Sequence, residues 1–480
     1  MKALSGVLGE IVGRSRATLA QRKARAPQRA RRAEHGSVRA FQAAIAKPGR
    51  RFIFECKLAS PSSGRIRPHG DIVQIAAGYD GIADVLSVLT EPSYFGGSLE
   101  DIARVRQVTK APVLRKDFTL DPYDVEESWA HGADAVLLML SVLDDETYRA
   151  CRATAARLGL GTITEVHDEA ELARASALGA PVIGVNNRDL RTLRVDLATT
   201  ERLGRRAPST CLMVSESGIG THDDVRRLSA YAKAFLVGTS LTQEPRTDLA
   251  ARELAFGAVK VCGLCRPEDA SLAYRAGAVY GGLIFAPGSP RRIDAARARE
   301  LMRSAPLRFV GVFTTTEPAE ILTVAREVPL DVIQIHAPAR EAAVAELRRE
   351  LPHVEIWCAR SVDDPSEDTS ADRILFDSRD PGLPGGSARD GAEGAIRFGG
   401  TGKTFDWSLL PDIPRARIVL AGGVNPANVC AARATGAAVL DVNSGVEARP
   451  GVKAPELVHA LFANLRTGTG APSGGQSNAG

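Results

Sequence analysis

The chain has 480 residues, of which 44% are hydrophobic and 25% charged, an ordinary composition for a globular protein. A single hydrophobic core rarely grows to this size, so we expect two domains. The formal net charge of +4 gives no reason to expect a nucleic-acid or membrane partner. The sequence shows no bilayer-spanning apolar run and no signal segment, and its seven cysteines are scattered. We therefore expect a cytoplasmic protein without a disulfide framework.

The first expected element is an N-terminal helix. Apolar residues at helical spacing predict it over residues 4–24, and a basic run follows over residues 22–32. This run could be a nucleic-acid patch or part of a targeting peptide. A solvated face of an extra helix that covers the mouth of the following domain is the simpler interpretation.

A glycine followed by a short apolar run recurs in both halves of the chain, at Gly132, Gly179, Gly277 and Gly436. A glycine just past a helix can adopt the left-handed cap, and the apolar run after it is typical of a strand buried on both faces. Strands that alternate with helices at this spacing indicate a parallel α/β architecture.

Strand-like runs number eight in each half of the chain. In the first half they lie at residues 52–58, 84–90, 112–118, 135–141, 161–166, 182–187, 212–218 and 234–240. In the second half they lie at residues 259–264, 280–285, 308–314, 332–337, 355–360, 373–378, 418–423 and 439–445. This pattern predicts an α/β protein of two consecutive (β/α)8 TIM barrels, the first with the extra helix. An open doubly wound sheet competes, but no Gly-x-Gly-x-x-Gly follows the first strand of either half.

The domain boundary is expected where the last helix of the first half meets the next strand. We assign residues 1–254 to the first barrel and 255–466 to the second. The Gly/Ser-rich tail at 467–480 and the segment at 380–399, rich in Gly, Pro, Ser and Asp, are expected to be unstructured.

Ionisable and polar side chains gather at the predicted strand ends of the first half. Side chains there point into the barrel mouth, where reacting groups are found. They are Glu55, Lys57, Lys116, Glu165, Asn186, Arg188 and Glu216. One charge would be explained by a structural ion pair, but several of mixed sign favour an acid/base site. Gly218 and Gly238 lie at the ends of the last two predicted strands, where they could admit a phosphate to backbone N–H groups or form plain turns.

Five segments of this half resemble the signatures of indole-3-glycerol-phosphate synthase. They are ECKLASPS at 55–62, LRKDF at 114–118, TEV at 164–166, GVNNRDL at 184–190 and SESGI at 215–219. The resemblance implies conversion of 1-(2-carboxyphenylamino)-1-deoxyribulose 5-phosphate into indole-3-glycerol phosphate, with loss of CO2 and water. It covers nearly all of the first half, including the extra helix.

The same resemblance implies roles for the site residues. Lys116 would be the general acid of ring closure and Glu165 its partner in dehydration. Lys57, oriented by Glu55, would bind the carboxylate and phosphate region and share proton transfer. Residues implied in substrate positioning are Asn186, Arg188, Glu216 and Ser217, those around the phosphate are Ser60, Gly218, Gly238 and Thr239, and those beside the aromatic ring are Phe95 and Phe118. We expect desolvation in the mouth to lower the pKa of a lysine against the effect of neighbouring carboxylates.

In the second half, Cys262 ends the first predicted strand and Asp377 ends the sixth. A thiolate base and a carboxylic acid can together move a proton between adjacent carbons. Cys262 and Cys265 also form a Cys-x-x-Cys, but a zinc site needs two more ligands and a redox pair needs a different structural context. We therefore expect no metal here, although oxidation to an inhibitory disulfide is a hypothesis.

Four segments of the second half resemble phosphoribosylanthranilate isomerase: KVCGL at 260–264, GGTGKTFDW at 399–407, LAGGVNP at 420–426 and VNSGVE at 442–447. The implied reaction is the Amadori rearrangement of N-(5-phosphoribosyl)anthranilate, with Asp377 as the acid and Cys262 as the base. Arg291 would hold the anthranilate carboxylate, although the adjacent Arg292 leaves the choice open. The residues implied around the phosphate are Gly402, Gly422, Gly423, Ser444 and Gly445. His336 stands at a matching position but is expected to be structural.

Three features depart from the isomerase pattern: Cys265 in place of threonine, Cys358 in place of lysine, and an insertion at 380–396. The two resemblances nevertheless support each other, because the product of the second half is the substrate of the first. They imply small phosphosugar-anthranilate substrates, no cofactor, and a chain that we expect to be a monomer. Histidine-pathway isomerases are an alternative, but we would expect aspartates at the ends of strands one and five. A nucleic-acid-binding protein that uses the basic N-terminus is the other alternative.

Overall fold

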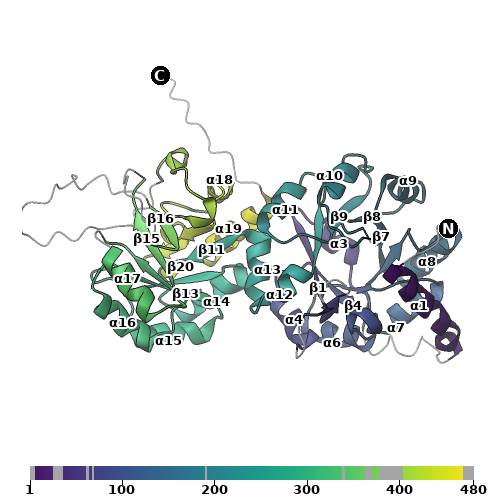
Figure 1. Ribbon diagram of the computed structural model, residues 1–480, viewed down its shortest axis with the longest axis horizontal. Helices are drawn as coiled ribbons and strands as arrows, with labels where there is room; N and C mark the ends of the chain where they lie inside the picture. The colour runs from purple at the N-terminus through teal and green to yellow at the C-terminus, as the bar shows by residue number, and fades with distance from the viewer. Residues whose placement is uncertain are drawn as a thin grey trace, which may run out of the picture. The chain divides into compact units, whose positions relative to one another are not determined.

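The computed structural model describes residues 6–24, 36–60, 64–66, 70–189, 192–337, 341–362, 370–377 and 404–468. The chain divides into two compact units, Met1–Ala255 and Phe256–Gly480. In each unit the described strands close into a barrel of parallel strands (Figure 1). The predicted fold class of two consecutive (β/α)8 barrels is therefore confirmed. None of the helices in these ranges combines the length and the apolar character needed to cross a membrane.

The first barrel closes by pairing of its last strand with its first. Its strands are β1 (Arg51–Cys56), β4 (Val85–Leu89), β5 (Val113–Lys116), β6 (Ala135–Met139), β7 (Gly161–Val166), β8 (Val182–Asn186), β9 (Leu212–Glu216) and β10 (Ala234–Val237). Its helices are α1 (Gly6–Ala24), α3 (Phe41–Ala46), α4 (Ile72–Tyr79), α5 (Pro92–Phe95), α6 (Glu100–Val108), α7 (Pro122–Ala130), α8 (Asp145–Leu158), α9 (Glu169–Ala177), α10 (Ala198–Gly204), α11 (His222–Leu228), α12 (Thr239–Gln243) and α13 (Thr247–Phe256). A short hairpin of β2 (Ala59–Ser60) and β3 (Gly64–Arg65) follows β1.

The second barrel closes in the same way, by pairing of β18 with β11. Its strands are β11 (Ala258–Val261), β12 (Tyr280–Ile284), β13 (Arg308–Phe313), β14 (Val332–Ile335), β15 (Glu355–Arg360), β16 (Arg373–Phe376), β17 (Ile418–Leu420) and β18 (Val439–Val442). Its helices are α14 (Pro267–Ala276), α15 (Ala295–Ser304), α16 (Pro318–Glu327), α17 (Glu341–Glu350), α18 (Val429–Ala434), α19 (Pro455–Thr467) and the 3-10 helices η2 (Trp407–Leu409), η3 (Arg415–Arg417) and η4 (Ser444–Val446). A second hairpin pairs β19 (Glu447–Arg449) with β20 (Val452–Lys453).

Local sequence signals explain where helices stop and strands begin. At the start of α7, Asp121 caps the helix in a capping box with Asp124, and Pro122 occupies a position where its missing N–H costs nothing. At its end the chain turns through Gly132, whose φ of 96° a side chain would disfavour, and enters β6. The glycines in the four predicted helix-to-strand hinges all have positive φ, so that prediction is confirmed.

Apolar side chains fill the interior of each barrel. In the first barrel they come from every strand and include Ile53, Ile163 and Val214, all fully buried. In the second barrel Trp357 is fully buried and packs edge-on against Tyr280, with ring centroids 5.2 Å apart. Each fully buried aliphatic side chain contributes about 1.5–3 kcal/mol. This packing holds the strands in register, so that the polar residues at their carboxyl ends are presented at the mouth.

Helix α1 packs against the first barrel beside α7 (Figure 1). Its residues Ile11 and Val12 are buried. Near its end, Arg22 forms an ion pair of 2.7 Å with Glu127 of α7, and Lys23 forms one of 2.9 Å with Asp121. The described part of the basic run is thus compensated by acidic residues of the same barrel, which supports the interpretation as an extra covering helix. Residues 25–35 lie outside the described part of the chain.

Candidate active sites

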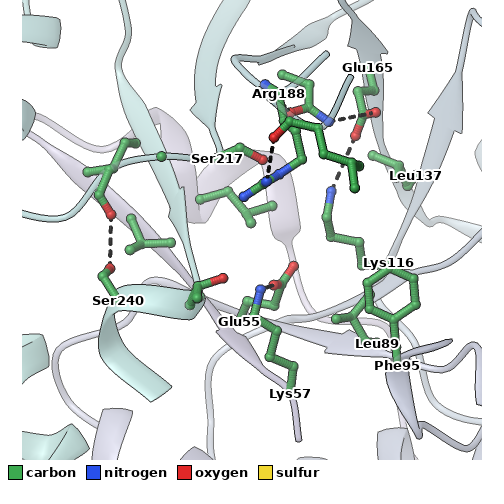
Figure 2. A pocket seen from close by; sticks show the side chains of 18 of the residues that line it. Glu55, Lys57, Leu89, Phe95, Lys116, Leu137, Glu165, Arg188, Ser217 and Ser240 are labelled. Atoms are coloured by element: carbon green, nitrogen blue, oxygen red, sulfur yellow. Dashed lines mark hydrogen bonds and ion pairs between the residues drawn. The ribbon is translucent and has the colours of Figure 1, made fainter. Parts of the chain in front are cut away.

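A cavity of about 380 Å³ opens at the carboxyl ends of the first barrel's strands (Figure 2). Helix α1 lines it with Leu8 and Ile11, and Phe95 and Phe118, suggested as walls for an aromatic ring, line it too. The predicted site residues that line the cavity are Glu55, Lys57, Lys116, Glu165, Asn186, Arg188, Ser217, Gly218, Gly238 and Thr239. The cavity therefore combines apolar walls with charged groups of both signs.

Lys116 lies between two carboxylates at the carboxyl ends of β5, β7 and β9. Its Nζ is 3.3 Å from Glu165 Oε2 and 2.8 Å from Glu216 Oε2. Burial alone would lower the pKa of Lys116, but the carboxylates of Glu216 and Glu165 outweigh it and raise that pKa above its ordinary value. The expectation that desolvation would lower the lysine pKa is therefore wrong at this position. The sequence showed which side chains converge but not how closely the carboxylates approach the ammonium.

His167 was missed from the sequence, although it lies two residues after Glu165. Its Nε2 is 3.3 Å from Glu165 Oε1, in the geometry of an ion pair rather than a hydrogen bond, and its Nδ1 is 3.1 Å from Glu171 Oε2. Burial alone would lower the pKa of His167. The carboxylates of Glu165 and Glu171 have the larger effect and raise that pKa to about 10. The imidazole is therefore cationic at neutral pH, and together with Lys116 it overcomes the effect of burial and lowers the pKa of Glu165.

Glu216 differs from Glu165 in its protonation. Burial and the nearby negative charge of Glu165 outweigh the attraction of Lys116 and raise the pKa of Glu216 to about 7. Space for this carboxyl is provided by Gly184 on the neighbouring strand, because a Cβ at Gly184 would collide with Glu216 Oε1. One carboxyl of the pair is thus held ionised and the other is able to gain or lose a proton near neutral pH.

Glu55 and Lys57 are two residues apart on β1 and form an ion pair of 2.9 Å. Figure 2 shows both side chains at the cavity. Burial raises the pKa of Glu55, but the charges of Lys57 and Lys116 lower it more, so the carboxylate is ionised. The site therefore contains two lysines, each with at least one carboxylate partner.

Asn186 and Arg188 lie at the rim formed after β8. Asn186 Nδ2 donates to Glu165 Oε1 at 3.2 Å, and the guanidinium of Arg188 donates to the carbonyl of Leu193 at 3.0 Å. Leu193 and Ser217 have φ values of 60° and 67°, and among the described non-glycine residues they alone have positive φ. Both line the cavity. A positive φ is unfavourable for a residue with a side chain and persists only where the surrounding structure enforces it. Such residues are concentrated at functional sites.

The loops after β9 and β10 continue the rim of the same cavity. They are tied together by Ser240, whose Oγ donates to the carbonyl of Ile219 at 2.9 Å. Gly218 lies in the first loop and Gly238 immediately precedes α12 in the second. The backbone of Ser60 pairs within the β2–β3 hairpin, but its side chain lies outside the described part of the structure.

In the second barrel, Cys262 follows β11 and contacts the buried ammonium of Lys260. The sequence analysis gave no role to this lysine. Lys260 Nζ is 3.2 Å from Cys262 Sγ, 2.9 Å from Gln334 Oε1 and 2.7 Å from Asp441 Oδ2. Gln334 in turn contacts the ring of His336. Burial raises the pKa of Cys262, and Lys260 opposes that effect only in part.

Asp377 directly follows β16 at the same end of the barrel as Cys262 and is half-buried. Its N–H donates to the carbonyl of Arg360 at 3.3 Å. None of the seven cysteines, all within the described ranges, forms a disulfide bond. The thiol of Cys265 contacts the carbonyl of Arg291 at 3.4 Å, whereas the thiol of Cys262 contacts Lys260. The two thiols of the Cys-x-x-Cys therefore have different partners in this structure.

Arg291 is engaged by Glu447, a residue whose role the sequence did not suggest. Arg291 Nε and Nη2 lie 3.0 and 2.7 Å from the two oxygens of that carboxylate, and Lys453 Nζ is 2.9 Å from Glu447 Oε1. Burial raises the pKa of Glu447, but Arg291 and Lys453 lower it more. The adjacent Arg292 is exposed. Arg291, the preferred candidate for carboxylate binding, is therefore held in a fixed orientation.

The loops after β17 and β18 meet at the mouth of the second barrel. Gly422 and Gly423 follow β17 with positive φ, and Ser444 and Gly445 lie in η4 after β18. A Cβ at Gly445 would collide with the backbone of the first loop, so the two loops approach closely. Gly402 and the insertion at 380–396 lie outside the described residues.

Two closed barrels, each with ionisable side chains gathered at its mouth, are the arrangement of an enzyme with two separate sites. Comparison with known families is consistent with this class. The family model for indole-3-glycerol phosphate synthase matches residues 8–254, and the model for N-(5'-phosphoribosyl)anthranilate isomerase matches residues 259–464.

Curated relatives contain both halves. The tryptophan biosynthesis protein TrpCF of Yersinia pestis is 44% identical over 416 residues, which cover 86% of this chain and 84% of the relative. TrpCF of Vibrio parahaemolyticus is 44% identical over 434 residues, which cover 90% of this chain and 88% of the relative. A solved phosphoribosyl anthranilate isomerase from Thermus thermophilus is 31% identical and covers 43% of this chain and 98% of its own, with a TM-score of 0.36.

The chain belongs to the TrpCF family of bifunctional tryptophan biosynthesis enzymes. Its first barrel is an indole-3-glycerol phosphate synthase, a decarboxylating lyase, and its second is a phosphoribosylanthranilate isomerase. The function expected from the sequence is confirmed.

Proposed function

We propose that the second barrel forms the aminoketose from N-(5-phosphoribosyl)anthranilate with Cys262 and Asp377, and that the first barrel closes the indole ring of that product with Lys116, Glu165 and Glu216. The observation that carries the proposal for the first barrel is the position of Lys116 Nζ, within 3.3 Å of both carboxylates. An acid flanked by two bases of different pKa is what ring closure followed by dehydration requires.

In the first barrel, the anthranilate ring carbon attacks the ketose carbonyl while Lys116 protonates the carbonyl oxygen. Loss of CO2 restores aromaticity in the anthranilate ring, and loss of the new hydroxyl as water then completes the indole. Glu165, ionised because Lys116 and His167 lower its pKa, takes part in the proton transfers of dehydration. Glu216, with a pKa of about 7, supplies a proton to Lys116 after the first transfer.

Substrate binding in this barrel is assigned to the remaining cavity residues. Lys57, held by Glu55 at 2.9 Å, binds the carboxylate and phosphate region and shares proton transfer. Groups proposed to position the substrate are Asn186, Arg188 and Ser217, and groups proposed to hold the phosphate are Ser60, Gly218, Gly238 and Thr239. Phe95 and Phe118, which line the cavity, would contact the aromatic ring.

In the second barrel, Asp377 protonates the ribose ring oxygen, so that the glycosylamine opens to an iminium. Cys262, as a thiolate, removes the proton from C2, and the resulting enol rearranges to the aminoketose. Arg291 holds the anthranilate carboxylate. Residues proposed for the phosphate are Gly402, Gly422, Gly423, Ser444 and Gly445, which support backbone N–H binding of an anion.

A fluorescence assay with phosphoribosylanthranilate tests both assignments. Cys262→Ala should lose isomerisation by about 10²–10⁴-fold, the range for a lost acid/base group, and should still convert added aminoketose. Lys116→Ala should consume phosphoribosylanthranilate and accumulate the aminoketose. A mixture of the two variants should restore flux, which controls for misfolding of either chain. Full flux through either variant alone would contradict the role assigned to its residue.

We also propose that the chain acts as a cytoplasmic monomer without a nucleic-acid partner. The proposed site residues of each barrel come from its own strands and loops, and seven cysteines outside any disulfide bond fit a reducing compartment. Light scattering at micromolar concentration should give the mass of one chain. Retention on heparin that depends on residues before Arg51 would contradict the last part of the proposal.

A further inference from the structure

The second barrel contains a buried cation whose three neighbours account for all of its donors. Lys260 is fully buried, and its ammonium lies among Cys262 Sγ, Gln334 Oε1 and Asp441 Oδ2. An ammonium group has three N–H donors. With each donor directed at a protein acceptor, Lys260 has none left for a substrate, so any part it has in the reaction must act through these neighbours.

A structural ion pair with Asp441 would be the simplest role for Lys260. Such a role does not explain why the ammonium also lies 3.2 Å from the sulfur of Cys262. Lys260 and Cys262 are two residues apart at the end of β11, so both side chains lie on the inner side of the barrel. Gly282 on the adjacent strand keeps this space open, since a Cβ there would lie 2.6 Å from Cys262 Sγ and 3.0 Å from Lys260 Cε.

The charges around Cys262 come from several elements, and they have opposite effects. Burial has the largest effect and raises the pKa of the thiol, Lys260 lowers it, Asp441 of β18 raises it, and Lys453 of β20 lowers it. Arg291, from the loop after β12, also interacts electrostatically with Cys262. The charge of Arg291 is compensated by its ion pair with Glu447 of β19. His336, after β14, is linked to Lys260 through Gln334. Of the groups named here, Lys260 contacts the sulfur directly, at 3.2 Å.

We infer that Lys260 is a positioning residue of the isomerase, which fixes the sulfur of Cys262 and stabilises it as a thiolate without touching the substrate. This inference rests on the proposed role of Cys262 as the base. Asp441 keeps the ammonium charged and oriented, but it also competes with the thiolate for that charge. Removal of Lys260 and removal of Asp441 should therefore change the acidity of Cys262 in opposite directions.

The full-length chain allows a direct test by titration of Cys262. Ultraviolet thiolate absorbance is measured against pH for each variant and for the same variant carrying Cys262→Ala, so that the difference reports this one thiol. Lys260→Met should move the titration midpoint upward by about one pH unit or more, a tenfold loss of thiolate below the midpoint, and Asp441→Asn should move it downward. The acid limb of the isomerase kcat/KM profile should move with the midpoint in each variant.

The outcomes separate this inference from the proposed function. A midpoint that stays in place in both variants, or moves the same way in both, would overturn the role of Lys260 even if Cys262 is the base. Full isomerase activity in Cys262→Ala would overturn the proposed base, whatever the titrations give. If Lys260→Met does not fold, Lys260→Gln takes its place, because it also removes the charge and should likewise move the midpoint upward.

Discussion

Lys116 Nζ lies 2.8 Å from Glu216 Oε2, a contact between strands β5 and β9 across the mouth of the first barrel. The ammonium is the stronger partner of Glu216, yet burial and the charge of Glu165 still leave Glu216 with a raised pKa. This combination separates the functions of two chemically identical carboxyls. The two carboxyls therefore differ in proton affinity, as the proposed roles of Glu165 and Glu216 require.

Replacement of Glu216 should reveal its proton affinity in the stability of the first barrel. A carboxyl whose folded pKa is raised, here from 4.5 to about 7, costs stability as the pH rises through that window, because the unfolded chain ionises first. Glu216→Gln should therefore raise the unfolding temperature of the first barrel more at about pH 8 than at about pH 5. It should also lower synthase kcat. An equal change in unfolding temperature at both pH values would contradict the raised pKa.

His167→Gln should have the opposite dependence on pH. The folded pKa of His167 is raised from 6.5 to about 10, so its contribution to stability is complete below pH 6.5 and disappears as the pH rises through 10. At acidic pH the free energy of unfolding of the variant should be lower by about 2 kcal/mol, the range of a charge-assisted hydrogen bond. At alkaline pH it should be nearly unchanged. Urea unfolding of the first barrel in wild type and variant, at acidic and at alkaline pH, measures this difference in stability.

The same variant should change the synthase reaction through Glu165. Without the imidazolium the pKa of Glu165 should rise, and the acid limb of the kcat/KM profile for the aminoketose should move to higher pH. Isomerase activity provides the matched control, because His167 belongs to the first barrel. A profile that falls uniformly, with no movement of its acid limb, would reduce His167 to a structural residue.

Glu447→Gln tests how Arg291 recognises the substrate. If Glu447 orients the guanidinium, its loss should raise the isomerase KM about tenfold, the value of one charge-assisted interaction, with a smaller effect on kcat. A lower KM would instead mean that Glu447 competes with the substrate carboxylate for Arg291. Arg292→Ala is the control for the neighbouring arginine, which is exposed, and it should have a normal KM.

Gly184→Ala should act as a selective synthase variant. The added Cβ collides with Glu216 Oε1 and would lie 2.8 Å from Ile163 Cγ2, so the carboxyl must leave its place beside Lys116. We expect synthase kcat to fall at least about tenfold with isomerase activity unchanged. Normal synthase activity in this variant would mean that the position of Glu216 is not critical.

The sequence predicts the barrels well because the information is local. Each of the four hinges at Gly132, Gly179, Gly277 and Gly436 has its own apolar run. The carboxyl ends of parallel strands must also converge, so the sequence alone places Lys116 and Glu165 at one mouth. Contacts between distant segments carry no such signal. Glu447 reaches Arg291 from 156 positions away, and Asp441 reaches Lys260 from 181. The sign of the pKa shift of Lys116 likewise depends on distances, which the strand pattern does not contain.

The division of the chain at Ala255 and Phe256 into two units, each with its own closed barrel, has a consequence for regulation. One messenger translated once yields equal numbers of two successive catalysts, so transcription cannot alter their ratio. A substitution at one mouth can change the balance between them, because each barrel has its own set of site residues.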